Sequence, residues 1–379
     1  MASSKEKDSS TASSHDKTAS GKFTSEISIY IPGIGYSQQE LPSSVNSGPP
    51  PEKIASTIHA FRQLFTRRSY FPVKDLVSIR QTREFMELNL STHFRSKEDI
   101  ESFLKTYPQY FAFTNGRIHL PHNFTRDGLM EYLEKHRTPS KSRNPVPYKL
   151  IESVEDCKIH VTSLKSRALQ GTPLVVAMDC EGVKLGKDGP LTLLQLGTVE
   201  GEVFIFDILA TPNKKDMFIN GGLKGILEDD KILKVIHDSR NDACALHFQF
   251  GVTLTNVFDT STAFTTLWDQ CNVSGEPRRP KLTALLEVFS FKAKHKTDSF
   301  ISQIHNNKLF GERPLTKQML EYASDDVLCL VSGMYETMNR LLSPLWRPFF
   351  EEEVKRDLRE SRIRDPYETY LMRKRQRFR

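Results

Sequence analysis

Cysteine is scarce in this sequence and shows no pairing pattern. The 379 residues include five cysteines, an odd number, and no C-x-x-C pair. They are Cys157, Cys180, Cys244, Cys271 and Cys329. Disulfide frameworks and zinc sites depend on even-numbered or closely spaced cysteines, so this set favours neither. We expect free thiols in a reducing compartment, packed as small apolar side chains.

Long apolar runs are also absent. No segment approaches the roughly 20 apolar residues that a membrane-spanning helix needs, and the first residues lack the apolar centre of a secretory signal. We therefore expect no membrane association and a cytoplasmic or nuclear location. The net charge is small, because 53 Lys and Arg against 47 Asp and Glu leave +6. This balance permits binding to phosphate and does not require it.

The positive charge gathers at the C-terminal end of the sequence. Residues 371–379 carry five basic side chains and no acidic one. Such an end suits salt-dependent contact with phosphates. It fits a nuclear-localisation patch or a solubilising tail equally well.

Composition divides the chain into five segments. We expect residues 1–51 to be disordered, because they begin with a stretch rich in Ser, Thr and Lys and end in consecutive prolines. The remaining predicted segments are a small domain at 52–136, a proline-containing linker at 137–148, a large domain at 149–345, and a charged helix with a basic tail at 346–379.

The small domain shows helical spacing followed by a hairpin signal. Apolar residues recur at helical spacing through 54–65, and Ser96-x-x-Asp99 resembles a capping box. Asn115-Gly116 between two short strand-like runs is a strong hairpin signal. Helices followed by a hairpin predict a mostly helical, winged-helix-like domain, which could bind nucleic acid, bind a protein partner or act as a structural cap.

Two acids follow a short apolar run in the large domain. Residues 174–178 read as a buried strand, and Asp179 and Glu181 come directly after it. Because successive strand side chains alternate between faces, these two carboxylates emerge on the same side. They would repel each other unless a cation lay between them. The same acids would also fit a strand end that turns into solvent.

A third acid follows a second apolar run. Residues 232–236 predict a strand, and the next residues predict a helix capped by Asp238 or Ser239. Asp242 would then lie about one turn into that helix. Asp238 is an alternative for the functional acid, and the pattern alone does not choose between them.

The last candidate residues share one helix face. Tyr322 and Asp326 are four residues apart in a stretch with helical apolar spacing, and Thr316 is the predicted N-cap. The alternative role for Tyr322 is core packing with a hydrogen-bonded hydroxyl.

Taken in order, these groups resemble a known family, the DEDDy-type, RNase D-like 3′–5′ exonucleases. The resemblance covers about residues 150–345 and rests on three motifs: Asp179-x-Glu181, His237-x-x-x-x-Asp242 and Tyr322-x-x-x-Asp326. It implies an α/β fold of the RNase H-like type, with a mixed sheet and helices on both faces.

The resemblance also implies a site that binds two Mg²⁺ or Mn²⁺ ions. Asp179, Glu181 and Asp326 would bind the ion that activates water, and Asp179 and Asp242 would bind the second ion. Tyr322 would orient the water and the scissile phosphate. Carboxylate oxygens suit these hard cations, and two ions can stabilise both the attacking and the leaving oxygen. The expected substrate is single-stranded nucleic acid, RNA rather than DNA.

The sequence leaves a second function open. The motif Asp-Cys-Glu-Gly at 179–182 resembles the corresponding motif in the branch of the family that contains Egalitarian and the exonuclease-domain proteins of small-RNA pathways. Some members of that branch have lost catalytic acids and act as RNA-binding adaptors. All four acids and the tyrosine are present here, which favours the enzyme.

Overall fold

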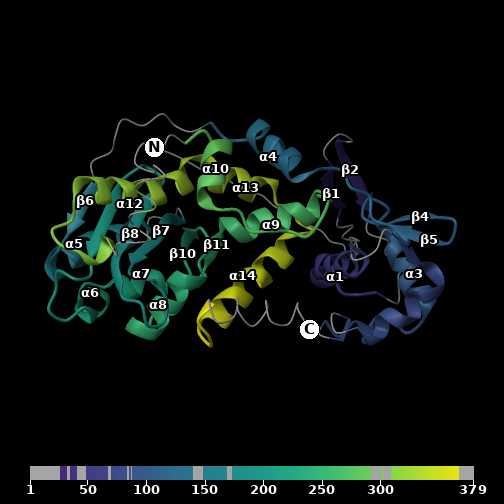
Figure 1. Ribbon diagram of the computed structural model, residues 1–379, viewed down its shortest axis with the longest axis horizontal. Coiled ribbons are helices and arrows are strands. Elements are labelled where there is room, and N and C mark those ends of the chain that lie inside the picture. Colours follow the sequence, from purple (N-terminus) through teal and green to yellow (C-terminus); the bar gives the residue numbers. More distant parts are fainter. Residues whose placement is uncertain are drawn as a thin grey trace, which may run out of the picture.

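The computed structural model describes residues 26–31, 35–40, 48–66, 70–82, 85–86, 88–139, 148–168, 173–291, 300, 302 and 309–366. The stretch 1–22 that begins the expected disordered segment, most of the predicted linker 137–148, and the basic end 371–379 lie outside these residues. A larger α/β part lies at one side of the molecule, and a smaller, mostly helical part lies at the other (Figure 1).

A six-stranded sheet forms the centre of the larger part. Its strands are β6 (Tyr148–Ile151), β7 (Leu174–Gly182), β8 (Leu191–Thr198), β9 (Val203–Asp207), β10 (Ile232–Ile236) and β11 (Val257–Asp259), in the order β11-β10-β7-β8-β9-β6. The central strands β7, β8 and β9 pair antiparallel, and all other pairs are parallel. Every residue of β8 is buried, because helices cover both faces of the sheet. This is the mixed α/β architecture that the sequence predicts.

Helices of different lengths surround this sheet. They are α5 (Val154–Ala168), α6 (Lys215–Ile219), α7 (Leu223–Leu227), α8 (Arg240–Phe250), α9 (Thr260–Gln270), α10 (Leu282–Val288), η4 (Leu309–Gly311), α12 (Lys317–Cys329), η5 (Leu330–Met334), α13 (Tyr335–Leu341) and α14 (Arg347–Ser361). Among the described residues, every helix is too short or too polar to span a membrane.

Helix α12 packs closely on the sheet, and two features hold it there. A Cβ atom on Gly197 of β8 would lie 3.0 Å from Val327 Cγ2, so a larger residue at this position would push the helix away. Just before the helix in the chain, the Arg313 guanidinium forms a bidentate ion pair, called the Arg313–Asp207 fork, with the buried Asp207 at the end of β9. Arg313 Nε lies 2.7 Å from Asp207 Oδ2, and Arg313 Nη2 lies 2.6 Å from Asp207 Oδ1. The predicted N-cap is confirmed, because Thr316 Oγ1 accepts a hydrogen bond from Met319 N.

The smaller part has a phenylalanine-rich core of its own. Its elements are η1 (Pro51–Lys53), α1 (Ile54–Thr66), β3 (Phe71–Pro72), η2 (Val73–Gln81), η3 (Leu90–Thr92), α3 (Lys97–Thr106), β4 (Ala112–Thr114) and β5 (Arg117–His119). The strands form a sheet in the order β3-β5-β4. The predicted capping box at Ser96 and Asp99 and the hairpin at Asn115-Gly116 are both confirmed. Asn115 and Gly116 adopt positive φ angles, 49° and 70°, as the tight hairpin turn requires.

Two strands lie within the N-terminal segment. Strands β1 (Glu26–Ile31) and β2 (Gly35–Glu40) pair antiparallel within the segment 1–51 that was expected to be disordered. The sequence of β1, EISIYI, alternates isoleucine with other residues. This period of two is the pattern of a strand, and the polar composition of the preceding residues obscures it.

Helix α14 joins the two parts of the molecule. Trp346, at its start, and Phe349 pack in the core of the smaller part, while Val354 and Leu358 pack in the larger core. Trp346 Nε1 also donates a hydrogen bond to the buried Tyr110 hydroxyl at 2.7 Å.

Polar contacts between α1 and the larger part strengthen this junction. Arg62 Nη1 donates to Asn272 Oδ1 at 2.6 Å, and His59 Nδ1 lies 2.7 Å from Asp269 Oδ2. Helix α4 (Arg126–Lys135), which the expected boundary at 136 places in the small domain, buries Leu129 and Leu133 in the larger core. The two parts are therefore fixed relative to each other by buried contacts.

The Arg313–Asp207 fork should contribute measurably to stability. Arg313→Met would leave a buried carboxylate without its partner, and we expect the free energy of unfolding to fall by about 3–5 kcal/mol. Lys105→Met is the control, because it removes an exposed pair with Glu101 on α3 and should cost less than about 1 kcal/mol. Urea denaturation followed by tryptophan fluorescence measures both values. Equal, small losses in the two variants would contradict the role given to the fork.

Candidate metal centre and the cleft around it

Three of the predicted carboxylates meet at one point. Asp179 and Glu181 leave the end of β7 on the same face, and Asp326 approaches from α12, which packs against that strand. One oxygen from each carboxylate lies within 4.8 Å of the others. Three negative charges at this spacing repel one another, and a bound divalent cation would remove that repulsion. The set offers the oxygen ligands that Mg²⁺ and Mn²⁺ prefer, so these residues fit such an ion.

Tyr322 lies one turn before Asp326 on the same helix, as predicted. Burial raises the pKa of its hydroxyl, and the negative charges of Asp326, Glu181 and Asp179 raise it further. The phenol therefore keeps its proton at neutral pH and can act as a hydrogen-bond donor beside the carboxylates. Its ring packs against Phe300 and Phe310, with centroids 5.6 and 6.0 Å away. These contacts fix the direction in which the hydroxyl points.

Asp242 lies in a different environment from the other three acids. It sits in the first turn of α8, as expected, and is almost fully buried. Its carboxylate contacts the thiol of Cys180, which alternates with Asp179 and Glu181 along β7. Asp242 is accordingly not a member of the three-carboxylate group. Burial, together with the nearby charges of Asp238 and Asp259, raises the pKa of Asp242 to about 7.

Asp238, the alternative to Asp242, is neutralised by arginines. Arg240 donates two hydrogen bonds to its carboxylate, at 2.6 and 2.8 Å, and Arg279 Nη1 lies 3.4 Å away. Burial alone would raise the pKa of Asp238, but the arginines outweigh it and the pKa is lowered. The structure therefore gives Asp238 a role in ion pairing at the turn before α8.

A second aspartate, Asp259, organises the turn that leads into α8. Its carboxylate accepts hydrogen bonds from Ser239 N and Ser239 Oγ, both at 2.8 Å, and from Asp238 N at 3.1 Å. Ser239 is the N-cap residue of α8, but its side chain bonds to Asp259 and makes no capping bond. Asp259 also caps α9 through Ser261 N and Thr262 N. The sequence places Asp259 at a strand end without revealing this role.

His237 connects the end of β10 to the edge of the cleft. Its Nε2 lies 3.1 Å from the Pro280 carbonyl oxygen, and its Nδ1 lies 2.9 Å from the Thr260 hydroxyl. Burial lowers the pKa of His237, so the ring is neutral at physiological pH. These contacts hold the segment around Pro280 in place.

The carboxylates open into a cleft of about 1270 Å³ whose far side is basic. Arg278, Arg279 and Lys281 line it from the segment before α10, and Arg126 lines it from the first turn of α4. Arg279 is paired with Asp238 and Asp357. Among the described residues, Arg126, Arg278 and Lys281 form no ion pair. Sequence reasoning missed these cations, because single basic residues in loops carry no pattern.

This chain is similar in sequence to several known proteins. A sequence model described as 3′–5′ exonuclease matches residues 151–343, which contain all five predicted site residues. The Egalitarian protein homolog of Caenorhabditis elegans is 30% identical over 183 residues, covering 47% of this chain and 31% of that protein. The mouse piRNA biogenesis protein EXD1 is 42% identical over 89 residues, covering 24% of this chain and 15% of that protein.

Ribonucleases D are also similar to this chain. Ribonuclease D of Desulfotalea psychrophila is 26% identical over 164 residues, covering 43% of this chain and 38% of that protein. The crystal structure of Trypanosoma brucei RNase D is 24% identical with a TM-score of 0.45, and the match covers 57% of this chain and 73% of that one. The matches span well under half the length of these curated relatives. Because the 3′–5′ exonuclease model matches half of the chain, the chain belongs to the 3′–5′ exonuclease family.

Proposed function

We propose that this protein is a metal-dependent 3′–5′ exonuclease that hydrolyses phosphodiester bonds at the 3′ end of single-stranded nucleic acid, RNA rather than DNA. The observation that carries the proposal is the group formed by Asp179, Glu181 and Asp326, whose oxygens lie within 4.8 Å of one another. The names of the ribonuclease D and piRNA biogenesis relatives support RNA as the substrate.

In this proposal the carboxylates bind the metal ions and Tyr322 orients the reacting groups. Asp179, Glu181 and Asp326 would hold one Mg²⁺ or Mn²⁺ ion, and Asp179 and Asp242 a second. When bound, the ions would lower the pKa of a water and stabilise charge on the phosphate. Tyr322 would donate its proton in a hydrogen bond that orients the water and the scissile phosphate. No side chain needs to form a covalent bond to the substrate.

The basic side of the cleft supports binding of the rest of the strand. Carboxylates alone would repel phosphates, and Arg126, Arg278 and Lys281 supply positive charge that no described carboxylate neutralises. Phosphates upstream of the scissile bond would contact these side chains. Arg126 belongs to α4, so the chain before the sheet contributes to the substrate path.

We also propose that the smaller part is a winged-helix-like domain within 52–136, followed by the exonuclease domain at 149–345 and a C-terminal helix and tail at 346–379. The support is its element order, in which a helix, a strand and further helices precede the β4–β5 hairpin, and its sheet order β3-β5-β4. In this proposal its surface is available to a protein partner or to nucleic acid.

A second candidate function is an RNA-binding adaptor on the same fold. One observation favours it: Asp242, the expected ligand of the second ion, lies outside the three-carboxylate group and contacts Cys180 instead. The adaptor would keep the basic side of the cleft and lose turnover.

A labelled RNA assay separates these two functions. With 5′-labelled single-stranded RNA, the intact protein should produce products shortened from the 3′ end in Mg²⁺ or Mn²⁺ and none in EDTA. Asp179→Ala/Glu181→Ala should abolish shortening, because it removes two metal ligands, while RNA binding in EDTA persists. If the intact protein shortens nothing with either metal but still shifts RNA in a gel, the adaptor function replaces the enzyme.

Tyr322→Phe tests the role of the phenol separately. Loss of one hydrogen-bond donor to the reacting groups should lower kcat about 10²-fold. The KM for RNA should stay nearly constant, because the ring and its contacts with Phe300 and Phe310 remain. Tyr148→Phe, on β6 at the far edge of the sheet, is the control and should leave kcat unchanged. An unchanged kcat in Tyr322→Phe would assign Tyr322 to packing alone.

A further inference from the structure

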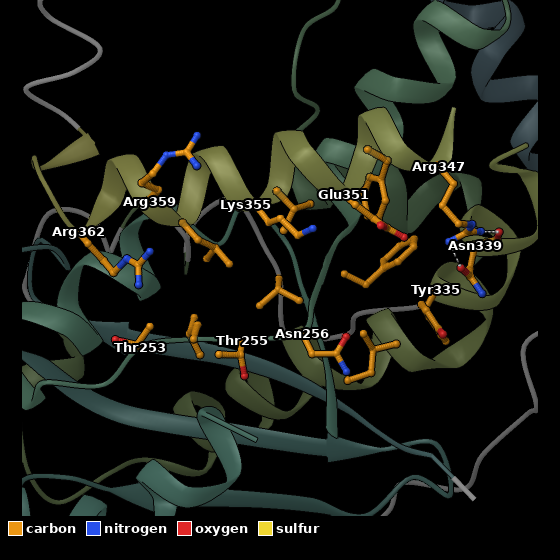
Figure 2. Close-up of a pocket in the computed structure, with 17 residues that line it drawn as sticks. Thr253, Thr255, Asn256, Tyr335, Asn339, Arg347, Glu351, Lys355, Arg359 and Arg362 are labelled. Carbon is orange, nitrogen blue, oxygen red and sulfur yellow. Dashed lines mark hydrogen bonds between the residues drawn. The ribbon is translucent and has the colours of Figure 1, made fainter. Parts of the chain in front are cut away.

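A second hollow lies on the other side of helix α14 from the cleft. It is a groove of about 790 Å³ between α14 and the edge of the sheet at β11 (Figure 2). Phe258, Phe350, Val354 and Leu358 contribute to its apolar floor. Thr253, Thr255 and Asn256, in the loop that leads into β11, lie along the wall opposite the helix (Figure 2).

The helix lines this groove with positive charge. Arg347, Lys355, Arg359 and Arg362 lie along it, and Glu351 is the one acid among its lining residues. Residues four apart on a helix share a face, so 347, 351, 355 and 359 form one stripe that faces the groove. In Figure 2 the Arg362 side chain points from the helix toward Thr253, and Lys355 lies midway along the groove. The stripe therefore presents three cations and one acid above an apolar floor, and Arg362 adds a fourth cation at its end.

These cations differ in how far they are neutralised. Arg347 donates hydrogen bonds to the side-chain oxygen of Asn339 at 3.0 Å and to its main-chain oxygen at 2.7 Å. These oxygens carry no full charge, so the positive charge of Arg347 stays uncompensated. Arg359 lies 3.8 Å from Glu352, in a pair in which both side chains are about half exposed. Within the part of the chain that the structure describes, Lys355 and Arg362 form no ion pair. Lys355 and Arg362 are therefore the side chains best placed to take an anion.

We propose that this groove binds a segment of single-stranded nucleic acid, with Lys355 and Arg362 contacting its phosphates. A row of cations suits a row of phosphates, and the hydroxyl and amide groups of the facing wall suit bases and sugars. Tyr335, half-buried at the end of the groove, adds an aromatic side chain of the kind on which bases stack. An acidic peptide could pair with the cations, but it has no bases or sugars to contact the polar wall and to stack on Tyr335.

Two further features agree with a nucleic-acid strand. The chain leaves α14 close to Arg362, and the sequence that follows carries Arg373, Lys374, Arg375, Arg377 and Arg379. A basic segment thus follows the stripe in the sequence, after the ten residues 363–372. The groove is also separate from the cleft, because Asp357, whose position on α14 is turned away from Lys355, pairs with the cleft residue Arg279. The proposal therefore does not depend on catalysis and applies to an enzyme or an adaptor.

Fluorescence anisotropy of a labelled single-stranded RNA tests the groove directly. The full chain is titrated in EDTA, so that no RNA is hydrolysed, at several salt concentrations. For Lys355→Gln/Arg362→Gln we expect about 25-fold weaker binding at about 0.1 M salt, because each lost phosphate contact removes about 0.7 from the slope of log K against log salt. The slope should fall by about 1.4 in total.

The control carries the same change of charge elsewhere. Lys158→Gln/Lys215→Gln alters exposed lysines of α5 and α6 and should change the affinity less than about 2-fold. Glu351→Gln removes the one acid of the groove and should tighten RNA binding. It also keeps the test informative if the double variant unfolds.

Three results would overturn the proposal. Equal weakening by the groove and control variants would show that RNA responds only to net charge. Unchanged RNA binding in Glu351→Gln would show that the strand does not lie in the groove. If Lys355→Gln/Arg362→Gln lost binding to labelled polyglutamate but kept binding to RNA, the groove would be a site for acidic peptides instead.

Discussion

The close packing of α12 on the central strands is the constraint on which the rest of this structure depends. The candidate ligands come from two elements that are far apart in the sequence, the end of β7 and the middle of α12. They meet only because Gly197 lets Val327 approach within van der Waals distance and because Arg313 binds Asp207 below the helix. A helix held a few tenths of an ångström further out would separate the carboxylates and weaken any shared ion.

Local patterns predicted strands, helices and the faces that candidate residues share, and the family resemblance joined these residues into one candidate site. Strand alternation placed Asp179 and Glu181 on the same face of a strand, and helical spacing placed Tyr322 and Asp326 on the same face of a helix. Contacts between distant residues left no such pattern. The Arg313–Asp207 fork, the Arg279–Asp357 pair and the basic side of the cleft depend on how elements pack, and a single charged residue in a loop gives no sign of its partner. The contact of Asp242 with Cys180 was missed for the same reason.

Helix α14 has a highly charged sequence, yet it contributes side chains to the cores of both parts of the molecule. Its N-terminal turn completes the phenylalanine-rich core of the smaller part, and its middle packs on the larger core. On one side Asp357 holds the cleft residue Arg279, and on the other a basic stripe faces the groove beside β11. One helix therefore fixes the two parts relative to each other and separates two surfaces that suit phosphates. A strand bound in the groove and a 3′ end in the cleft would both be positioned by the same rigid element.

We propose that Asp179, Glu181 and Asp326 form a centre for divalent cations. Crystals grown with Mn²⁺ and measured for its anomalous scattering test this most directly, because the signal identifies the ion and its position together. We expect an anomalous peak bonded to oxygens of these three carboxylates, and we expect it to be lost in crystals of Asp326→Asn. A map with no peak between these residues, from crystals that show Mn²⁺ bound elsewhere on the protein, would contradict it.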